Sequence, residues 1–372
     1  MFQAKDLGLY IHIPFCKTIC VYCAFSTFAN KNSQVNAYIE ALIREIKEKS
    51  VAFANRPLKT IYFGGGTPSI LETTTLKQIL DTVHESFDTR ALQSVEIECN
   101  PESLSLEKIQ AYRALGITRI SVGIQTLHDR SLWKIARPHN GDIALKALED
   151  LNTAGFANFG CDLIIGLPYQ TLESFQSDVK KLLSFQPAHL STYFLSMDTL
   201  KIQTFIADSP SEDEQVAMYE WADEYLTGTG FLHYEVSNYA LPGSESKHNL
   251  RYWNRQEYLG VGLSAHSYYN QTVFENNHNF TEYLQFPGKS IFQLKLENDL
   301  LINDYILLLL RLQKGIELAS FKKLFGKEKT SHLLTKSKSW IEDGYLTITP
   351  SYLAATNKGR LLLDTITKKL CL

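Results

Sequence analysis

The sequence contains few cysteines, no long apolar run and no excess of basic charge. Lysine and arginine together number 37 against 40 aspartates and glutamates, so the formal net charge is −3. This balance gives no reason to expect nucleic-acid binding. The longest apolar run, YILLLL at 305–310, is far shorter than the roughly 20 residues that span a bilayer. The first residues also lack the apolar core of a secretory signal. We therefore expect a cytoplasmic protein with no transmembrane segment.

Although only six cysteines occur in 372 residues, three of them lie within eight positions, in CKTICVYC. These are Cys16, Cys20 and Cys23. In the cytoplasm, clustered thiols favour a metal or redox site over disulfides. Four thiolates would close a zinc site or a cluster, whereas three leave one metal position open. In a [4Fe–4S] cube, three cysteines bind three irons, and the fourth iron is free to take another ligand.

A zinc site with three cysteines and one histidine is the alternative. His12 is the candidate fourth ligand, but Pro14 and Phe15 separate it from Cys16. The ligand types favour the iron–sulfur interpretation over zinc. A loop without function is the least favoured interpretation, because closely spaced cysteines in a cytosolic protein usually have a function.

Short β-rich runs alternate with helical patterns from the N-terminus to about residue 200. Strands are expected at 7–13, 59–66, 94–100, 119–125, 158–168 and 189–196, and helices at 34–49, 76–87, 104–116, 144–155 and 172–185. Repeated strand–helix alternation is typical of parallel β/α units. The six units predict an α/β fold, an open or partial (β/α)6 barrel. In such folds the chemistry lies at the C-terminal ends of the strands.

The pattern of predicted helices and strands changes twice after the barrel. Residues 201–297 predict an α+β extension rich in aromatics, with a helix at 212–228 and then strands and loops that include HNLRYWN. Residues 298–372 predict an apolar helix, a second helix, a hairpin and a last helix. This order resembles a small winged-helix-like module. The module is not strongly basic, so a structural or partner-docking role is favoured over DNA binding.

Polar and glycine residues stand where the predicted strands end. FGGGTP at 63–68 ends the second strand, and its glycines permit positive φ angles and close approach of the backbone to a ligand. No Gly-Lys-Ser/Thr follows, so this is not a P-loop. Four further polar residues are Glu98 in EIECNPE, Gln125 in SVGIQT, Arg137 in ARPH and Asp162 in CDLIIGLP. Polar groups at successive strand ends are hard to explain as core packing.

The C-x3-C-x2-C spacing in the first β/α loop of a barrel resembles the signature of the radical S-adenosylmethionine (SAM) superfamily. The resemblance implies a [4Fe–4S] cluster on Cys16, Cys20 and Cys23. Its open iron would chelate the amino and carboxylate groups of SAM. An electron from the cluster would then cleave the sulfonium and release a 5′-deoxyadenosyl radical.

The same resemblance implies a set of SAM-binding residues. Gly65, Gly66 and Thr67 would contact the SAM amino group, Glu98 would bind the ribose, and Tyr10 would flank the adenine. The remaining cofactor-binding residues are Tyr22, Gln125, Arg137 and Asp162.

Four segments, LYIHIPFC, YFGGGTP, SVGIQT and DLIIGLP, resemble one branch of this superfamily. That branch contains the oxygen-independent coproporphyrinogen III oxidases and related heme chaperones, and the resemblance runs from about residue 8 to the C-terminus. Three features favour the chaperone group. Phe25 stands where the oxidase has a further cysteine, only fifteen residues precede Cys16, and HNLRYW at 248–253 fits the chaperone pattern H-N-x-x-Y-W.

The HNLRYW motif suits heme chemically. His248 is the predicted axial ligand to the heme iron, and Tyr252 and Trp253 offer flat surface to the porphyrin. Arg251 or Lys247 would pair with a propionate. The alternative is a histidine packed in a polar loop. His266, in GLSAHSYY, is a second candidate ligand, although a barrel-mouth or core position is favoured for it.

These residues predict a heme chaperone that holds heme, a [4Fe–4S] cluster and SAM. It would deliver heme to target hemoproteins such as respiratory enzymes, with the membrane surface as one place of delivery. The alternative is an oxygen-independent coproporphyrinogen III oxidase, which decarboxylates propionates to form protoporphyrinogen IX. A radical SAM enzyme with another substrate ranks third. The sequence leaves open whether the protein is a homodimer.

Overall fold

The computed structural model describes residues 6–29, 31–196 and 206–371. Six parallel strands form the centre of the fold and lie side by side in chain order. They are β1 (Leu7–Ile13), β4 (Leu58–Gly65), β5 (Ser94–Cys99), β6 (Arg119–Gln125), β7 (Phe159–Ile165) and β8 (His189–Phe194). The predicted (β/α)6 arrangement is therefore confirmed.

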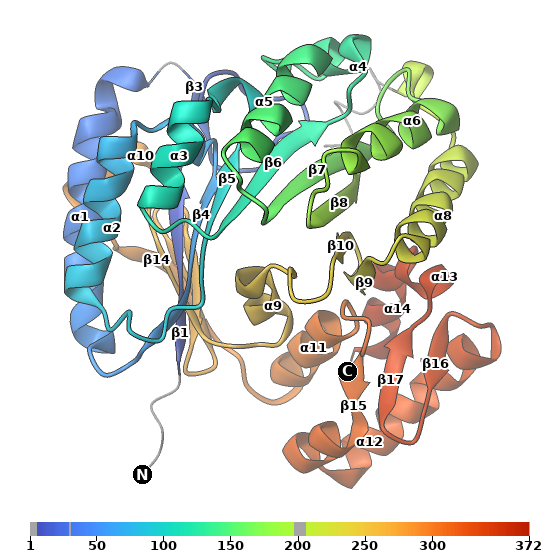
Figure 1. The fold of residues 1–372 in the computed structure, drawn as a ribbon. Coiled ribbons are helices and arrows are strands. Elements are labelled where there is room, and N and C mark those ends of the chain that lie inside the picture. The colour runs from blue at the N-terminus through green and yellow to red at the C-terminus, as the bar shows by residue number, and fades with distance from the viewer. Residues whose placement is uncertain (1–5, 30, 197–205, 372) are drawn as a thin grey trace.

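A helix connects each strand to the next and covers the outside of the curved sheet (Figure 1). These helices are α1 (Val35–Ser50), α2 (Thr73–Ser86), α3 (Leu106–Ala114), α5 (Gly141–Thr153) and α6 (Leu172–Leu183), with the short α4 (Asp129–Lys134) before α5. α1 shows why they form, since it buries Tyr38, Leu42 and Ile46, which share one face. α3 and α5 stop at Gly116 and Gly155, both with positive φ, as the sequence predicts.

The sheet continues past both ends of the parallel core. On one side it adds β11 (Tyr258–Val261), which runs parallel to β1, followed by the antiparallel strands β12 (His266–Tyr269), β13 (Thr272–Asn276) and β14 (Ser290–Lys295). On the other side it adds β10 (Asn238–Ala240) and β9 (Leu232–Glu235). The helices α8 (Glu212–Gly228) and α10 (Phe280–Gln285) accompany these strands. The described strands thus form one twelve-stranded open sheet, which runs from β14 to β9.

One prediction of secondary structure was wrong. The HNLRYW segment, expected among strands and loops, forms the helix α9 (Lys247–Trp253). The Ser246 side chain caps it by accepting a hydrogen bond from the Asn249 N–H. The helix has only seven residues, which is too short to show a clear helical period, so the sequence pattern did not reveal it. α9 packs against β4 and β5 and touches α11 (Asn298–Leu309), as Figure 1 shows.

The C-terminal residues build a separate apolar core around Ile306, Phe321 and Leu353. After α11 come β15 (Ile316–Glu317), α12 (Leu318–Glu342, broken at Gly326), β16 (Leu346–Ile348), β17 (Tyr352–Ala355), α13 (Asn357–Arg360) and α14 (Leu363–Leu370). A three-stranded sheet of β15, β17 and β16 packs with these helices. This is the winged-helix-like order that the sequence predicts. Among the described residues, no helix is long and apolar enough to cross a membrane.

Candidate cluster and cofactor site

The three-cysteine loop is anchored at its base. It lies between two short parallel strands, β2 (Phe15–Cys16) and β3 (Phe28–Ala29), directly after β1. The Phe28 N–H donates to the Pro14 carbonyl over 2.7 Å. Cys16 is buried, whereas Cys20 and Cys23 are partly exposed. The loop therefore presents its thiols at the C-terminal end of the first barrel strand.

Polar side chains lie beside all three thiols. The Thr67 hydroxyl donates to Cys16 Sγ over 3.5 Å, and an Arg137 guanidinium nitrogen donates to Cys20 Sγ over 3.5 Å. Cys23 Sγ lies 3.8 Å from the Thr27 hydroxyl. Burial raises the pKa of the Cys16 thiol. The guanidinium places a positive charge beside Cys20 Sγ. The donor set suits an iron–sulfur cluster.

The zinc alternative finds no support in this geometry. Among the described residues, no three His, Cys, Asp or Glu side chains stand close enough to hold one metal ion. Both ring nitrogens of His12 already have hydrogen-bond partners. Nε2 donates to the Ser26 carbonyl over 2.9 Å, and Nδ1 accepts from the Tyr10 hydroxyl over 3.0 Å. Burial lowers the pKa of His12 to about 4, so the ring is neutral. In a cube each cysteine binds its own iron, which does not require three thiols around one ion.

A cavity of about 450 Å³ opens beside the cysteine loop. Its lining contains nearly every residue that the sequence predicted for the cluster and SAM, namely Cys16, Cys20, Tyr22, Cys23, Gly65, Gly66, Thr67, Glu98, Gln125, Arg137 and Asp162. These residues come from the first loop, from the ends of β4, β5 and β6, and from β7 and the segment after α4. The convergence follows from parallel strands whose C-terminal ends share one edge.

Among the residues predicted to bind SAM, Tyr10 lies outside this lining. It sits one layer deeper, where its ring stacks on Tyr62 with 6.1 Å between the centroids. Its hydroxyl is hydrogen-bonded to His12. Tyr10 therefore does not line the cavity, and the predicted contact with adenine stays a prediction.

Gly66 lets the end of β4 approach the cysteine loop. A Cβ at this position would stand 2.7 Å from the Phe15 carbonyl oxygen and 3.0 Å from Cys16 Sγ. The Gly66 N–H donates to the Ile13 carbonyl over 2.8 Å, which holds the two segments together. A glycine is needed because any side chain here would press on the thiol.

Two carboxyl groups face the cavity, Glu98 from β5 and Asp162 from β7, with β6 between the two strands. Glu98 accepts hydrogen bonds from the Tyr62 hydroxyl over 2.7 Å and from the Gly65 N–H over 3.2 Å. Loss of solvent at the bottom of the cavity raises the pKa of Glu98 to about 7. Asp162 accepts from the Ser191 hydroxyl over 2.6 Å and from Ser121, and burial also raises its pKa. These serines are the partners that a carboxyl group on an apolar strand requires.

Asn100, which was not predicted from the sequence, lines the cavity and connects two of its other residues. Its Nδ2 donates to the Thr67 hydroxyl over 3.3 Å, and its Oδ1 accepts from Arg137 over 2.8 Å. Asn100 thus connects the residues beside Cys16 and Cys20. Its position directly after β5 was the available signal. Tyr193 and Phe194, at the end of β8, line the cavity as half-exposed aromatics and were also missed.

The predicted heme ligand His248 is fully buried, with 0% of its surface exposed. Its Nε2 shares a 2.7 Å hydrogen bond with the Tyr252 hydroxyl, and its Nδ1 shares one of 2.8 Å with the Thr60 hydroxyl. Both ring nitrogens are therefore engaged inside the barrel. The structure does not bring His248 to the lining of the cysteine cavity. Ligation of an iron would require the ring to give up one of these bonds.

The residues around His248 differ in their burial and their contacts. Arg251 is buried and donates to Asp6 over 2.7 Å, so it is committed to a structural ion pair. Lys247 is exposed. Trp253 is partly buried beneath the Arg311 guanidinium, which lies 4.5 Å from the ring centroid. His266 is neither core nor enclosed: its side chain is 54% exposed and lies 3.4 Å from Glu275.

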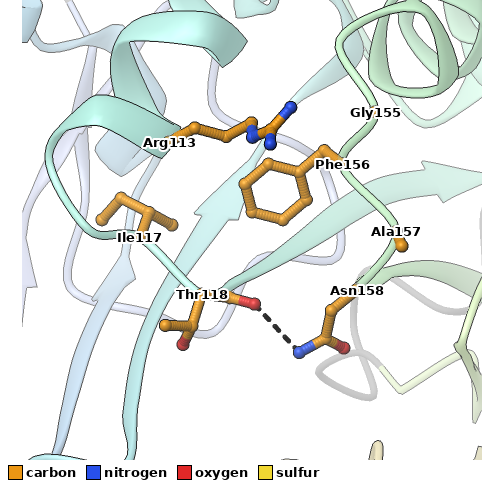
Figure 2. A pocket seen from close by; sticks show the side chains of 7 residues that line it. All are labelled: Arg113, Ile117, Thr118, Gly155, Phe156, Ala157 and Asn158. Carbon is orange, nitrogen blue, oxygen red and sulfur yellow. Dashed lines mark hydrogen bonds between the residues drawn. The ribbon is translucent and has the colours of Figure 1, made fainter.

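A second hollow of about 210 Å³ lies at the opposite edge of the sheet, near the starts of β6 and β7 (Figure 2). It is lined by Arg113, Ile117, Thr118, Gly155, Phe156, Ala157 and Asn158. The Asn158 amide donates to the Thr118 carbonyl over 2.9 Å, and Arg113 donates to the Ala154 carbonyl. Its polar groups thus serve the adjoining turns, and none of the predicted site residues lies there.

Family patterns match two parts of the chain. The radical SAM superfamily pattern matches residues 10–182, and the HemN C-terminal domain pattern matches residues 296–362. The solved structure of coproporphyrinogen III oxidase (HemN) from Escherichia coli, a radical SAM enzyme, superposes with a TM-score of 0.87 at 22% identity. That superposition covers 100% of this chain and 91% of the other. It shows a shared fold.

Relatives with higher identity carry one name. The heme chaperone HemW of Lactococcus lactis subsp. lactis is 37% identical over 88% of this chain and 89% of its own. The heme chaperone HemW of Bacillus subtilis is 32% identical over 95% of this chain and 96% of its own. These matches span most of both chains. The chain therefore belongs to the family of the heme chaperone HemW, within the radical SAM superfamily.

Proposed function

We propose that this protein is a heme chaperone that binds heme, a [4Fe–4S] cluster and SAM, and that it delivers heme to target hemoproteins such as respiratory enzymes. The observation that carries the proposal is the near full-length match to relatives named heme chaperone HemW. Cytoplasmic location, delivery at the membrane surface and a homodimeric state are further parts of the proposal.

The cavity supports the cofactor part of this proposal. Cys16, Cys20 and Cys23 would hold the cluster, and SAM would occupy the space between the loop and the strand ends. When bound, the cluster and SAM supply one-electron chemistry. The chain's own residues orient the cofactor: Glu98 offers a carboxylate to the ribose hydroxyls, and Gly65 and Gly66 leave room for close approach of the backbone.

Position 25 supports a chaperone over an oxidase. In the related oxidases the resemblance places a further cysteine here, whereas this chain has Phe25, whose side chain is 67% exposed beside the cavity. A phenyl ring cannot act as a thiol. It offers an apolar surface at the mouth of the cluster site instead.

Heme would bind at α9, with His248 as axial ligand and Tyr252 and Trp253 against the porphyrin. Because His248 is enclosed, this requires the Tyr252 hydroxyl to release Nε2 and α9 to shift from β4 and β5. Burial lowers the pKa of His248 to about 3, so the ring remains a neutral imidazole, the form that ligates iron. His266 is reachable without such a shift and is the second candidate.

A heme titration tests the proposal. We expect anaerobically purified, cluster-loaded protein to bind heme saturably, with growth of the Soret band. His248→Phe keeps a flat ring in the buried position but has no nitrogen for iron, so heme affinity should fall by about tenfold or more, the scale of losing a metal-site contact. The matched control is His332→Ala, which removes an exposed histidine on α12.

Other results of the titration are equally informative. If His266→Ala weakens heme binding and His248→Phe does not, the axial ligand is His266. If no variant and no wild-type protein binds heme while the cluster is intact, the chaperone proposal fails. The reduced protein should then be incubated anaerobically with SAM and coproporphyrinogen III. Formation of protoporphyrinogen IX would establish the oxidase alternative.

Glu98 should make SAM binding depend on pH near neutrality. Its carboxyl has a pKa of about 7, raised by lost solvation and by Asp162 and lowered by Tyr62, the Gly65 N–H and Arg119. The ionised form is the better acceptor for ribose hydroxyls, so SAM affinity should rise by about tenfold from pH 6 to pH 8. In Glu98→Gln this part of the profile should be lost. The SAM amino group titrates in both proteins, so a difference between their profiles belongs to Glu98, and equal profiles would contradict its role.

A further inference from the structure

α9 packs against β4 and β5 and contributes no residue to the lining of the cysteine cavity. Its N-terminus is bound by Glu96, whose carboxylate accepts hydrogen bonds from the Ser246 hydroxyl over 2.7 Å and from the His248 N–H over 3.1 Å. Glu96 also pairs with Arg119 over 3.3 Å. At Gly8 a Cβ would stand 2.8 Å from the Arg251 side chain, so the first strand leaves space for this helix. α9 is thus built into the interior of the barrel.

α9 also contacts Tyr62, which lies on the inner face of β4. The His248 ring stacks on the Tyr62 ring, with 5.2 Å between centroids and 25° between planes. Tyr62 is itself buried, and its hydroxyl donates to Glu98 over 2.7 Å. Its ring passes over Gly64, where a Cβ would stand only 2.8 Å from the Tyr62 ring. The Tyr62 ring is thus packed against His248 and Gly64, and its hydroxyl is directed at the Glu98 carboxyl group.

Glu98 depends on this arrangement. One of its carboxylate oxygens accepts a hydrogen bond from the Tyr62 hydroxyl, and the other accepts one from the Gly65 N–H. The latter comes from the backbone at the C-terminal end of β4. Removal of the tyrosine contact would leave the carboxyl group held from one side, free to turn within the cavity. A hydrogen bond to a charged group is among the stronger single contacts in a protein.

We propose that His248 and Tyr62 are positioning residues for Glu98, so that the helix carrying the HNLRYW motif supports the SAM pocket as well as the heme site. The proposal gives the motif a role in the heme-free protein. The contacts involved are those of the heme-free chain, and the role does not require His248 to bind heme. It does rest on the proposed assignment of the cavity to SAM.

Two substitutions at His248 separate positioning from ligation. His248→Phe keeps a flat ring beneath Tyr62 but cannot bind iron, whereas His248→Ala leaves Tyr62 without its neighbour. We expect His248→Ala to raise the dissociation constant of SAM by about tenfold and His248→Phe to stay within about threefold of the wild type. SAM binding is measured by equilibrium dialysis on heme-free protein with matched cluster content. Recovery of affinity by phenylalanine is the result that general damage would not produce.

Tyr62→Phe tests the other contact without altering the stack, because it removes only the hydroxyl. It should weaken SAM binding by about tenfold. The matched control is Tyr112→Phe, since Tyr112 is a fully buried tyrosine on α3 whose hydroxyl has no partner among the described residues. Wild-type SAM affinity in both Tyr62→Phe and His248→Ala would overturn the proposal. Equal losses in His248→Ala and His248→Phe would also overturn the role of the stacked ring.

The outcome is independent of heme. If the heme titration fails but the SAM series behaves as expected, the positioning role stands and the chaperone proposal falls. If SAM does not bind even to wild-type protein with an intact cluster, the assignment of the cavity fails, and the positioning proposal fails with it.

Discussion

Replacing Cys16, Cys20 or Cys23 by serine should abolish the iron–sulfur cluster, each substitution alone being sufficient. A serine hydroxyl is not ionised near neutral pH and is a poor ligand for iron compared with a thiolate. With only three cysteines in the loop, no spare thiolate lies there to replace the lost one. After anaerobic reconstitution, iron and sulfide per chain should fall by at least about tenfold, with loss of the visible absorption of the cluster.

Cys371→Ser is the matched control for this experiment. Cys371 is partly buried at the C-terminal end of α14, in the winged-helix-like module, and does not line the cavity. Its substitution should leave the iron content unchanged. A cluster that survives in Cys20→Ser would contradict the three-ligand assignment. Wild-type protein that takes up one zinc ion and no iron would restore the zinc interpretation.

The second large effect is expected at Gly65, where alanine should unfold or strongly destabilise the protein. Gly65 has φ +111°, a conformation that side chains rarely adopt, and a Cβ would stand 2.4 Å from the His12 ring. That ring cannot move freely, because its two nitrogens are bound to Tyr10 and to the Ser26 carbonyl after the cysteine loop. Backbone strain and overpacking each cost about 1–3 kcal/mol, so the free energy of unfolding should drop by roughly 3–5 kcal/mol.

Gly116→Ala separates strain from the clash. Gly116 also has a positive φ, +80°, but a Cβ there would meet nothing within 4 Å. Denaturant titration should therefore show a loss of only about 1–2 kcal/mol for this variant. If both alanine variants lose the same stability, contact with His12 does not explain the need for glycine at position 65.

The barrel was predictable because its strands carry strong local signals. β1 and β6 coincide with the predicted ranges 7–13 and 119–125. Strands of a parallel sheet that are buried on both faces read as short apolar runs, and here glycine, proline or a polar residue follows each of them. The order of the outer strands was not predictable. β11 lies beside β1 although about 250 residues separate them in sequence, and no local pattern indicates such a pairing.

The candidate site was also predictable only in part. Most of the predicted residues that line the cavity lie in the loop after β1 or at the end of a strand, and parallel strands bring those positions together. The burial of His248 was hidden, since it depends on Thr60 and Glu96, which lie on strands far away in the sequence. Tyr62 gave no signal either, because tyrosine is common in strands for reasons of packing alone.

The pairing of β1 with β11 also determines the order of events during synthesis. One edge of β1 can pair with β4 early, but the other edge stays open until residues 258–261 have been made. At about 5–20 residues per second, that takes about 10–50 s. The loop base is completed later still, when the Leu263 N–H donates to the Tyr38 hydroxyl, which itself donates to the His12 carbonyl. The cysteines thus leave the ribosome long before their pocket exists, so cluster insertion into the finished site comes after most of the chain has been translated.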